Sequence, residues 1–370
     1  MSDRTPIVCV IGTRPEAIKM APVIKALRKS DWAQCSVIAT AQHRGLLDQT
    51  LTPFGIVPDI DLDLMTEGQS MVELTSRLLP SLSEAVTRLG ARAVLAQGDT
   101  ASVFAAALVA FYAQISFGHV EAGLRTHDLG QPFPEEGFRQ MVARLSRWHF
   151  APTESAASNL RDEGIAPDAI HVTGNTGIDS LMEVAAVARK QAASGNRAGR
   201  RLILLTAHRR ESFGEPMANI FSAVRRVADS YPDIDVLYPV HPNPNVKSMA
   251  EAMLGGHPRI ALCEPMEYPD FVHAMADSHL ILTDSGGIQE EAPALSKPVL
   301  VLREQTERPE AIDFGVARLV GTDPGIIFDE VARLLDDPVH YRRMAVGRSP
   351  YGDGSAAPRI AEVLRGELAT

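Results

Sequence analysis

Residues 119–136, HVEAGLRTHDLGQPFPEE, bring four carboxylates together in a stretch that a glycine and two prolines make too irregular for an ordinary helix. Glu121 follows the apolar run ISFGHV, and Glu135 begins the helix-like segment EEGFRQMVARLS. Carboxylates at such positions can serve as general acids or bases. Glutamates in a first helical turn are also common for structural reasons, because they complement the helix dipole. The stretch is therefore a candidate catalytic segment with a structural alternative.

A further carboxylate, Asp99, lies between the apolar run AVLAQ and the helix-like segment TASVFAAALVA. An aspartate in this setting is commonly an N-cap, which is the structural alternative here. The next predicted strand, however, ends in Glu121. Because neighbouring parallel strands end at the same edge of a sheet, we expect Asp99 and Glu121 to lie at one rim.

Basic side chains follow other predicted strands. In GTRPEAIKM, Gly12 permits a tight turn and Arg14 would project from it, but the motif is not the G-x-G-x-x-G dinucleotide fingerprint. In TAHRRESFG, His208 and Arg209 end the run LILLTAH, and His241 ends another run in VHPNPNV. Arginine offers a fixed fork of donors to a diphosphate, although arginine beside glutamate also suits a surface ion pair. No histidine has a partner at H-E-x-x-H spacing, so we expect no metal site.

The segment LTDSGGIQEEAPAL places Ser285, Gly286 and Gly287 directly after an apolar strand. The free N–H groups at the start of the helix that follows could bind phosphate, and Glu291 could accept hydrogen bonds from a ribose diol. The structural alternative is that Ser285 only caps this helix and that the glycines only allow close packing.

Predicted strands and helices alternate along the whole chain: short apolar runs are followed by longer segments of helical period, and these elements position the candidate residues. This alternation predicts α/β architecture with two Rossmann-like, doubly wound parallel sheets. Apolar content falls and Gly, Ser and Arg collect near residues 191–200, which we interpret as a linker. The predicted parts are an N-terminal domain at 1–190, a C-terminal domain at 201–350, and a closing helix within 351–370 that could pack on either domain. Ligands bind beyond the carboxyl ends of parallel strands, so two facing sheets would form one cleft.

Composition narrows the class of function. The 370 residues carry a formal net charge of -10, which argues against a general nucleic-acid binder. Cys9, Cys35 and Cys263 are widely spread and lie in or beside apolar runs, which favours buried thiols in a reducing compartment over disulfides or zinc ligands. No apolar run approaches the length of a membrane span, and the N-terminal run is too short for a signal sequence. We therefore expect a cytoplasmic protein that does not bind membranes.

Taken in order, these motifs resemble the non-hydrolysing UDP-N-acetylglucosamine 2-epimerases over nearly the whole chain. The resemblance is carried by GTRPEAIKMAPVI, TAQHRGLLDQ, QGDTASVFAAALVA, HVEAGLRT, PFPEEGFRQ, VTGNTGID, HRRESFG, VHPNPNV, DSGGIQEEAPALSKPVLVLR, TERPEA and SPYGDG. Many motifs in one order are far more specific than any single one. The resemblance implies a GT-B-like fold, UDP held mainly by the C-terminal domain, a homodimer, and no cofactor.

The resemblance also implies roles for individual residues. The family's catalytic groups fall on three carboxylates and a histidine, namely Asp99, Glu121, Glu135 and His208. Its substrate contacts fall on Arg14, Lys19, Arg209, His241, Ser285, Gly286, Gly287, Glu291 and Arg308. Gln42 and His43 match the region where some bacterial members bind a second UDP-N-acetylglucosamine as an activator. Gly68 stands where those members carry an arginine, which counts against this effector site.

The implied reaction is the reversible conversion of UDP-N-acetylglucosamine to UDP-N-acetylmannosamine for surface-polysaccharide synthesis. UDP is eliminated from C1 as H2 is removed, and it adds back to 2-acetamidoglucal as C2 is protonated on the other face. Acid and base groups must therefore reach both faces of C2, which requires carboxylates from separate backbone segments. Our hypothesis is that Asp99 and Glu121 flank the sugar, with Glu135 completing the proton path or orienting a partner.

Four alternatives stay open. A glycosyltransferase could use the same scaffold, because fold alone does not fix function. A hydrolysing relative would release UDP, and a relative for a modified UDP-diacetamido sugar would differ only in pocket residues that no motif identifies. From a different class, a nucleotide-sugar sensor would bind without turnover.

Overall fold

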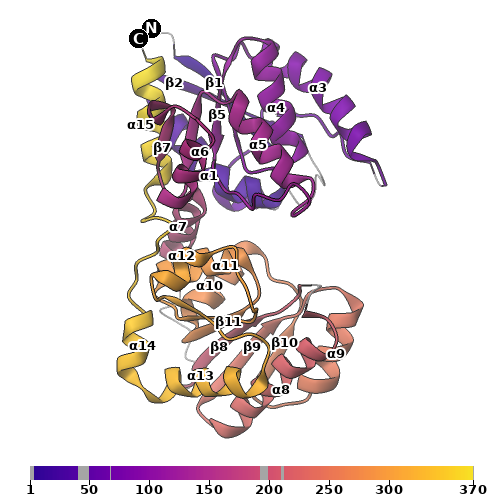
Figure 1. The fold of residues 1–370 in the computed structure, drawn as a ribbon, viewed down its shortest axis with the longest axis vertical. Helices are drawn as coiled ribbons and strands as arrows, with labels where there is room; N and C mark the ends of the chain where they lie inside the picture. Colours follow the sequence, from indigo (N-terminus) through magenta and orange to yellow (C-terminus); the bar gives the residue numbers. More distant parts are fainter. Residues whose placement is uncertain (1–3, 41–49, 67, 192–198, 210–211, 370) are drawn as a thin grey trace. The chain divides into compact units, whose positions relative to one another are not determined.

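The computed structural model describes residues 4–40, 50–66, 68–191, 199–209 and 212–369. Contacts divide the chain into two units, which are considered separately below. Unit 1 comprises Met1–Ser180 with Tyr351–Thr370, and unit 2 comprises Leu181–Pro350. Each unit is a parallel sheet with helices, so the prediction of two Rossmann-like α/β domains is confirmed (Figure 1).

The sheet of unit 1 has seven strands in the order β3-β2-β1-β4-β5-β6-β7. The strands are β1 (Thr5–Ile11), β2 (Ala33–Ala39), β3 (Ile60–Asp61), β4 (Ala93–Gln97), β5 (Ser116–Val120), β6 (Trp148–Ala151) and β7 (Ile170–Val172). The helices are α1 (Arg14–Lys29), α3 (Met71–Arg88), α4 (Ala101–Tyr112), α5 (Glu135–Leu145), α6 (Glu154–Asp162) and α15 (Ala356–Leu368), with 3-10 turns at Thr52–Phe54 and Pro167–Ala169. Helix α7 (Thr176–Gln191) begins in unit 1 and continues into unit 2. All pairings are parallel.

The sheet of unit 2 has six strands in the order β10-β9-β8-β11-β12-β13, again all parallel. Its strands are β8 (Arg201–Thr206), β9 (Ile234–Pro239), β10 (Ile260–Cys263), β11 (Leu280–Thr283), β12 (Val299–Val301) and β13 (Ala317–Leu319). Its helices are α8 (Glu215–Ser230), α9 (Pro244–Leu254), α10 (Tyr268–Asp277), α11 (Gly286–Glu291), α12 (Pro309–Asp313), α13 (Pro324–Asp336) and α14 (Pro338–Met344), with a 3-10 turn at Ala292–Leu295.

The central strands are apolar on both faces because helices cover both faces of a doubly wound sheet. Residues 7–11 of β1 are all buried, and the residues of β4 and β11 are buried throughout. Helix α1 starts where a capping box forms between Thr13 and Glu16, and basic Arg28 and Lys29 occupy its last turn. These local preferences agree with the tertiary packing, which fixes the strand ends where the candidate site residues lie.

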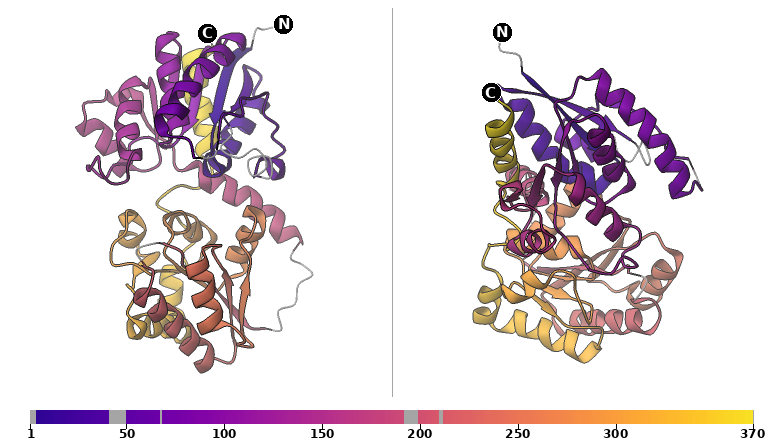
Figure 2. Two further views of the ribbon diagram at one scale, coloured as in Figure 1. Left: turned by 90° about the vertical axis from the view of Figure 1, so that its right-hand side faces the viewer. Right: turned by 45° about the horizontal axis from the view of Figure 1, so that its top comes forward.

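The closing helix α15 packs against α1 in unit 1 (Figures 1 and 2). Asp179 of α7 accepts hydrogen bonds from the backbone N–H groups of Ala356 and Ala357, at 3.2 and 2.9 Å, and the Asn175 N–H donates to the Tyr351 carbonyl at 2.7 Å. The predicted linker falls mostly on residues 192–198, outside the described residues. Contacts assign Leu181 onward, within α7, to unit 2, whereas the sequence pattern extends the first domain to residue 190. The helical period of α7 gives no sign of where its contacts change.

The described cysteines are free, with Cys9 buried and the other two half-buried. Within the described part of the chain, no helix is long and apolar enough to cross a membrane.

Candidate active site

The turn after β1 is held by a buried carboxylate. Glu16 is 2% exposed, and its Oε2 accepts the N–H groups of Gly12 at 2.6 Å and Thr13 at 3.3 Å. Burial raises the pKa of Glu16 to about 7. A Cβ atom at Gly12 would lie 2.5 Å from the Ser102 hydroxyl, so the position requires glycine. The turn places Arg14 at the start of α1, as the sequence predicts.

Glu121 directly follows β5 in a left-handed conformation, with φ at 64°. Its Oε2 lies 2.5 Å from Nζ of Lys19 on α1 and accepts a hydrogen bond from Nε2 of Gln97 at 3.0 Å. Gln97 is the last residue of β4, the neighbour of β5 in the sheet. A non-glycine residue in this conformation is uncommon and is retained where the surroundings fix it, which is frequent at functional sites.

Asp99 follows β4 and is bound by Arg139 of α5. Nε and Nη2 of Arg139 lie 2.8 and 2.7 Å from Oδ2 of Asp99, and Nη1 lies 3.3 Å from Oε2 of Glu136. The N-cap of α4 is Thr100, so the interpretation of Asp99 as the cap is wrong. The carboxylate is instead available at the same strand-end rim as Glu121, since β4 and β5 are adjacent.

The two glutamates that begin α5 differ in their surroundings. Glu135 is half-buried at the first position of the helix, as the sequence predicts. Glu136 is fully buried and accepts hydrogen bonds from the Thr126 N–H at 3.1 Å and from Gln140 at 3.0 Å. Burial acts to raise the pKa of Glu136, but these contacts and Arg139 hold it below its ordinary value. Glu136 is therefore a buried anion that anchors Arg139 rather than a first-turn surface charge.

Sequence reasoning missed Gln97 and Arg139 as site residues. The only signal for Gln97 was its place at the end of an apolar run, and Arg139 reads as a helix-surface partner of the glutamates one turn earlier. Arg125, in the same irregular stretch, pairs with Glu163 of the loop after α6 at 2.5 and 2.9 Å.

In unit 2, the candidate basic residues lie beyond adjacent strands around a buried aspartate. Oδ2 of Asp284, after β11, accepts the backbone N–H groups of His208 at 2.6 Å and Arg209 at 2.8 Å. The His208 ring stacks on that of His241, with centroids 5.4 Å apart and planes 10° apart. The strand ends of β8, β9 and β11 thus bring His208 and His241 together, with Arg209 bound to Asp284 beside them.

The S-G-G segment lies close to the two predicted arginines. Helix α11 begins at Gly286, and a Cβ atom there would lie 3.9 Å from Nη2 of Arg209 and 4.0 Å from Cζ of Arg308. Ser285 occupies the N-cap position without a side-chain capping bond among the described residues, which removes the support for a capping role alone. Arg308 contacts Glu290, and the Tyr268 hydroxyl lies 3.5 Å from Oε1 of Glu291.

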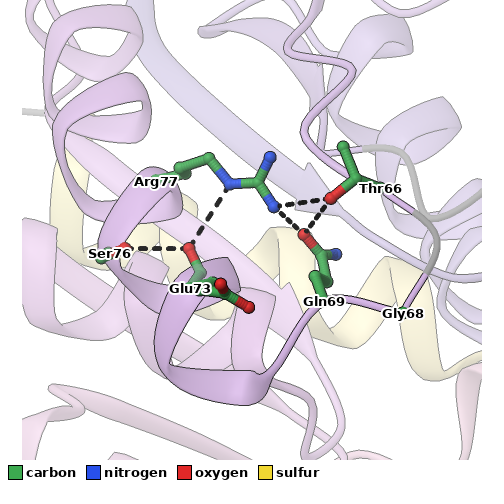
Figure 3. A pocket seen from close by; sticks show the side chains of 6 residues that line it. All are labelled: Thr66, Gly68, Gln69, Glu73, Ser76 and Arg77. Carbon is green, nitrogen blue, oxygen red and sulfur yellow. Dashed lines mark hydrogen bonds between the residues drawn. The ribbon is translucent and has the colours of Figure 1, made fainter.

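A separate pocket of about 380 Å³ lies in unit 1 at the start of α3 (Figure 3). Its lining residues are Thr66, Gly68, Gln69, Glu73, Ser76 and Arg77. Arg77 donates to the Thr66 hydroxyl at 3.1 Å and also contacts Gln69. The predicted effector residues Gln42 and His43 lie outside the described residues.

No group of three or more His, Cys, Asp or Glu side chains in the described ranges is arranged to hold a metal ion. The two sheets instead carry carboxylates with basic partners at the strand ends of unit 1, and histidine and arginine side chains at the strand ends of unit 2. This combination places the chain in the class of two-domain α/β proteins with the GT-B-like fold, whose ligands bind beyond the carboxyl ends of the strands.

Comparison with known proteins identifies the family. The family model described as UDP-N-acetylglucosamine 2-epimerase matches residues 25–365. UDP-N-acetylglucosamine 2-epimerase of Bacillus subtilis strain 168 is 49% identical over 97% of this chain and 94% of that protein, and the Escherichia coli K12 enzyme of the same name is 47% identical over 97% and 98%. The crystal structure of UDP-GlcNAc 2-epimerase from Neisseria meningitidis bound to UDP-GlcNAc covers 98% of this chain and 100% of that one, with a TM-score of 0.88 and 45% identity. The chain belongs to the UDP-N-acetylglucosamine 2-epimerase family.

Proposed function

We propose that the protein catalyses the reversible epimerisation of UDP-N-acetylglucosamine at C2, giving UDP-N-acetylmannosamine. The observation that carries this proposal is the pair of carboxylates at adjacent strand ends, with Glu121 held between Lys19 and Gln97 and Asp99 held by Arg139. Membership of the family supports it, as does the Neisseria meningitidis relative solved with UDP-GlcNAc.

Removal of the C2 proton of the sugar is difficult because C2 is not next to a carbonyl group. In the proposed reaction the C2–H bond breaks as UDP leaves C1 with the bonding electrons, so C1 and C2 become doubly bonded in 2-acetamidoglucal. UDP then returns to C1 while a proton is delivered to the other face of C2. Asp99 and Glu121 would act on the two faces, and Glu135 would complete the proton path or orient a partner. Carboxylates from separate backbone segments meet this requirement.

Departure of UDP places negative charge on the diphosphate, and preorganised donors are needed where that charge develops. We assign this role to basic side chains and backbone N–H groups, together with a ribose contact through Glu291. The donors are Arg14, His208, Arg209, Ser285, Gly286, Gly287 and Arg308, with His241 beside the nucleotide and Lys19 beside the sugar.

The test is incubation with UDP-N-acetylglucosamine in heavy water. We expect UDP-N-acetylmannosamine to form with deuterium at C2 of both sugars, without an acceptor or added cofactor. Glu121→Gln should lower turnover by a factor of about a hundred or more, the usual scale of general acid–base catalysis. Glu154→Gln is the matched control, because Glu154 is an exposed ion-pair partner of Arg161. Near-normal exchange by Glu121→Gln would refute the assignment of Glu121.

The same assay separates the alternatives. Inertness until an acceptor is added would indicate a glycosyltransferase, and stoichiometric release of free UDP would indicate a hydrolysing enzyme. Tight binding without exchange would indicate a sensor. A panel of UDP-sugars would identify a modified diacetamido substrate by its faster exchange.

We also propose that the protein is a cytoplasmic homodimer that supplies a surface-polysaccharide precursor. Exposed Phe111 and Tyr112, at the end of α4, support an association surface on unit 1, since they are 58% and 70% exposed. Light scattering of wild type and of Phe111→Ser would check this, with a monomeric wild type as the contrary result.

A further inference from the structure

Asp284 is a carboxylate fully closed off from solvent at the end of β11. Burying an unpaired carboxylate is costly, and Asp284 offsets this cost by accepting the backbone N–H groups of His208 and Arg209 on one oxygen, Oδ2. Burial acts to raise the pKa of Asp284, yet its contacts with His208 and the two N–H groups hold it below its ordinary value. The residue is therefore a buried anion directly behind the candidate diphosphate-binding histidine.

The second oxygen of this carboxylate, Oδ1, lies 3.2 Å from Nδ1 of His208. Among the described residues it has no hydrogen-bond partner, so the contact is close but not aligned as a hydrogen bond. The His208 side chain is 40% exposed, whereas Asp284 is 0% exposed. The ring can therefore adjust its angle while the carboxylate stays fixed.

The backbone around the histidine is held independently of its ring. The Tyr238 hydroxyl, buried in β9, donates to the Ala207 carbonyl at 2.7 Å, and the Asp284 contacts fix the N–H of the next residue. The His241 ring stacks on the His208 ring. The Nδ1 edge of the His208 ring thus faces Asp284, while 40% of the side chain stays exposed.

We propose that Asp284 is a positioning residue for His208: its Oδ1 accepts the Nδ1–H of the protonated ring, so that Nε2–H is the donor presented to the diphosphate of a bound nucleotide. The Nδ1–H···Oδ1 hydrogen bond aligns when the nucleotide binds, as contacts of this kind often tighten only in the substrate complex. When the ring is protonated, the carboxylate stabilises the imidazolium whose Nε2–H donates to the departing diphosphate. The role of His208 rests on the function proposed above.

Asp284→Asn is an informative variant because its amide oxygen can still accept the two backbone N–H groups. Its amide N–H would then face Nδ1 and disfavour a proton there, leaving a neutral ring with its single proton on Nε2. The control is Asp229→Asn, which alters a second aspartate–histidine pair in unit 2, where Asp229 Oδ1 lies 3.1 Å from Nε2 of His257 at an exposed position.

Two measurements test the proposal. In spectra of the ¹⁵N-labelled histidine rings, recorded with and without UDP, His208 should carry protons on both ring nitrogens in UDP-bound wild type and on Nε2 alone in UDP-bound Asp284→Asn. In kinetics, Asp284→Asn should lower kcat about a hundredfold in the wild-type background, the scale seen when a preorganised donor to developing negative charge is lost. In a His208→Asn background, Asp284→Asn should lower kcat by less than about twofold, because Asp284 acts through His208.

Equal losses in both backgrounds would overturn the proposal and leave Asp284 a structural residue only. Persistence of the doubly protonated His208 ring in UDP-bound Asp284→Asn would also overturn it. The spectra do not depend on turnover, so an inactive wild type would refute the proposed function without touching this inference. Asp229→Asn should leave both measurements of His208 unchanged.

Discussion

Two buried groups should make the stability of unit 1 depend on pH in opposite directions. His119 of β5 is 1% exposed, and its Nε2 lies 2.7 Å from the Gly98 carbonyl. Burial lowers the pKa of His119 from 6.5 to about 4. Burial raises the pKa of Glu16 from 4.5 to about 7. Each group is therefore driven towards its neutral form in the folded protein.

The signs follow from which state binds the proton. Above pH 6.5 His119 is neutral in both states, and as the pH falls from 6.5 towards 4 only the unfolded chain takes up the proton, so stability is lost. Between pH 7 and 4.5 only the folded chain keeps Glu16 protonated, so stability is gained as the pH falls. From about pH 7.5 to about pH 5, integration gives a loss of about 2 kcal/mol from His119 and a gain of about 2 kcal/mol from Glu16.

Substitution separates the two contributions. His119→Gln can still donate to Gly98 but cannot titrate, and Glu16→Gln can still accept the Gly12 N–H. On acidification over this range, His119→Gln should lose about 2 kcal/mol less unfolding free energy than wild type, and Glu16→Gln about 2 kcal/mol more. Burial also lowers the pKa of His149, in β6, to about 3. Its titration removes unfolding free energy on acidification in the wild type and in both variants.

Denaturant titrations followed by tryptophan fluorescence measure this directly, because both tryptophans, Trp32 and Trp148, belong to unit 1. His127→Asn, at an exposed left-handed position, is the control and should follow wild type. If the pH dependence of all variants runs parallel to that of wild type, the assignment of these groups to opposite signs is wrong.

Two further predictions concern the strand-end loops of unit 1. Gly123→Ala should reduce the unfolding free energy by at least about 2 kcal/mol in denaturant titrations, because φ is 89° and a Cβ atom would lie 2.1 Å from the Ala156 carbonyl oxygen. Gly137→Ala, inside α5 with no atom within 4 Å, should instead gain up to about 1 kcal/mol, and equal losses at both sites would contradict this account. Arg139→Gln should lower kcat about tenfold or more with little change in KM, because it removes the ion pair that positions Asp99 and changes no proposed nucleotide contact. A change in KM alone would contradict this role of Arg139.

The positions of the strand-end residues could be predicted because a parallel sheet aligns the ends of neighbouring strands. Asp99 and Glu121 follow β4 and β5, and His208 and His241 follow β8 and β9, as the apolar runs indicated. A run of buried residues is a local signal, since both faces of such a strand are covered.

The partners of these residues could not be predicted in the same way. Arg139 reaches Asp99 from the second turn of α5, and nothing in the helical pattern distinguishes it from a surface partner of Glu136. The burial of Glu136 depends on the Thr126 N–H, ten positions earlier across an irregular loop. The left-handed conformation of Glu121 runs against the local preference of glutamate and is imposed by its surroundings.

The return of the chain to unit 1 through α15 has a consequence for biosynthesis. Residues 351–370 leave the ribosome after all of unit 2. Until then, α15 cannot cover its face of α1, and Asp179 cannot accept the N–H groups of Ala356 and Ala357. Unit 2 is contiguous in sequence and can complete its own sheet first. The protein therefore inverts the usual vectorial order, in which the N-terminal domain is finished before the next one emerges. A chain truncated after residue 350 would therefore contain all of unit 2 but only an incomplete unit 1.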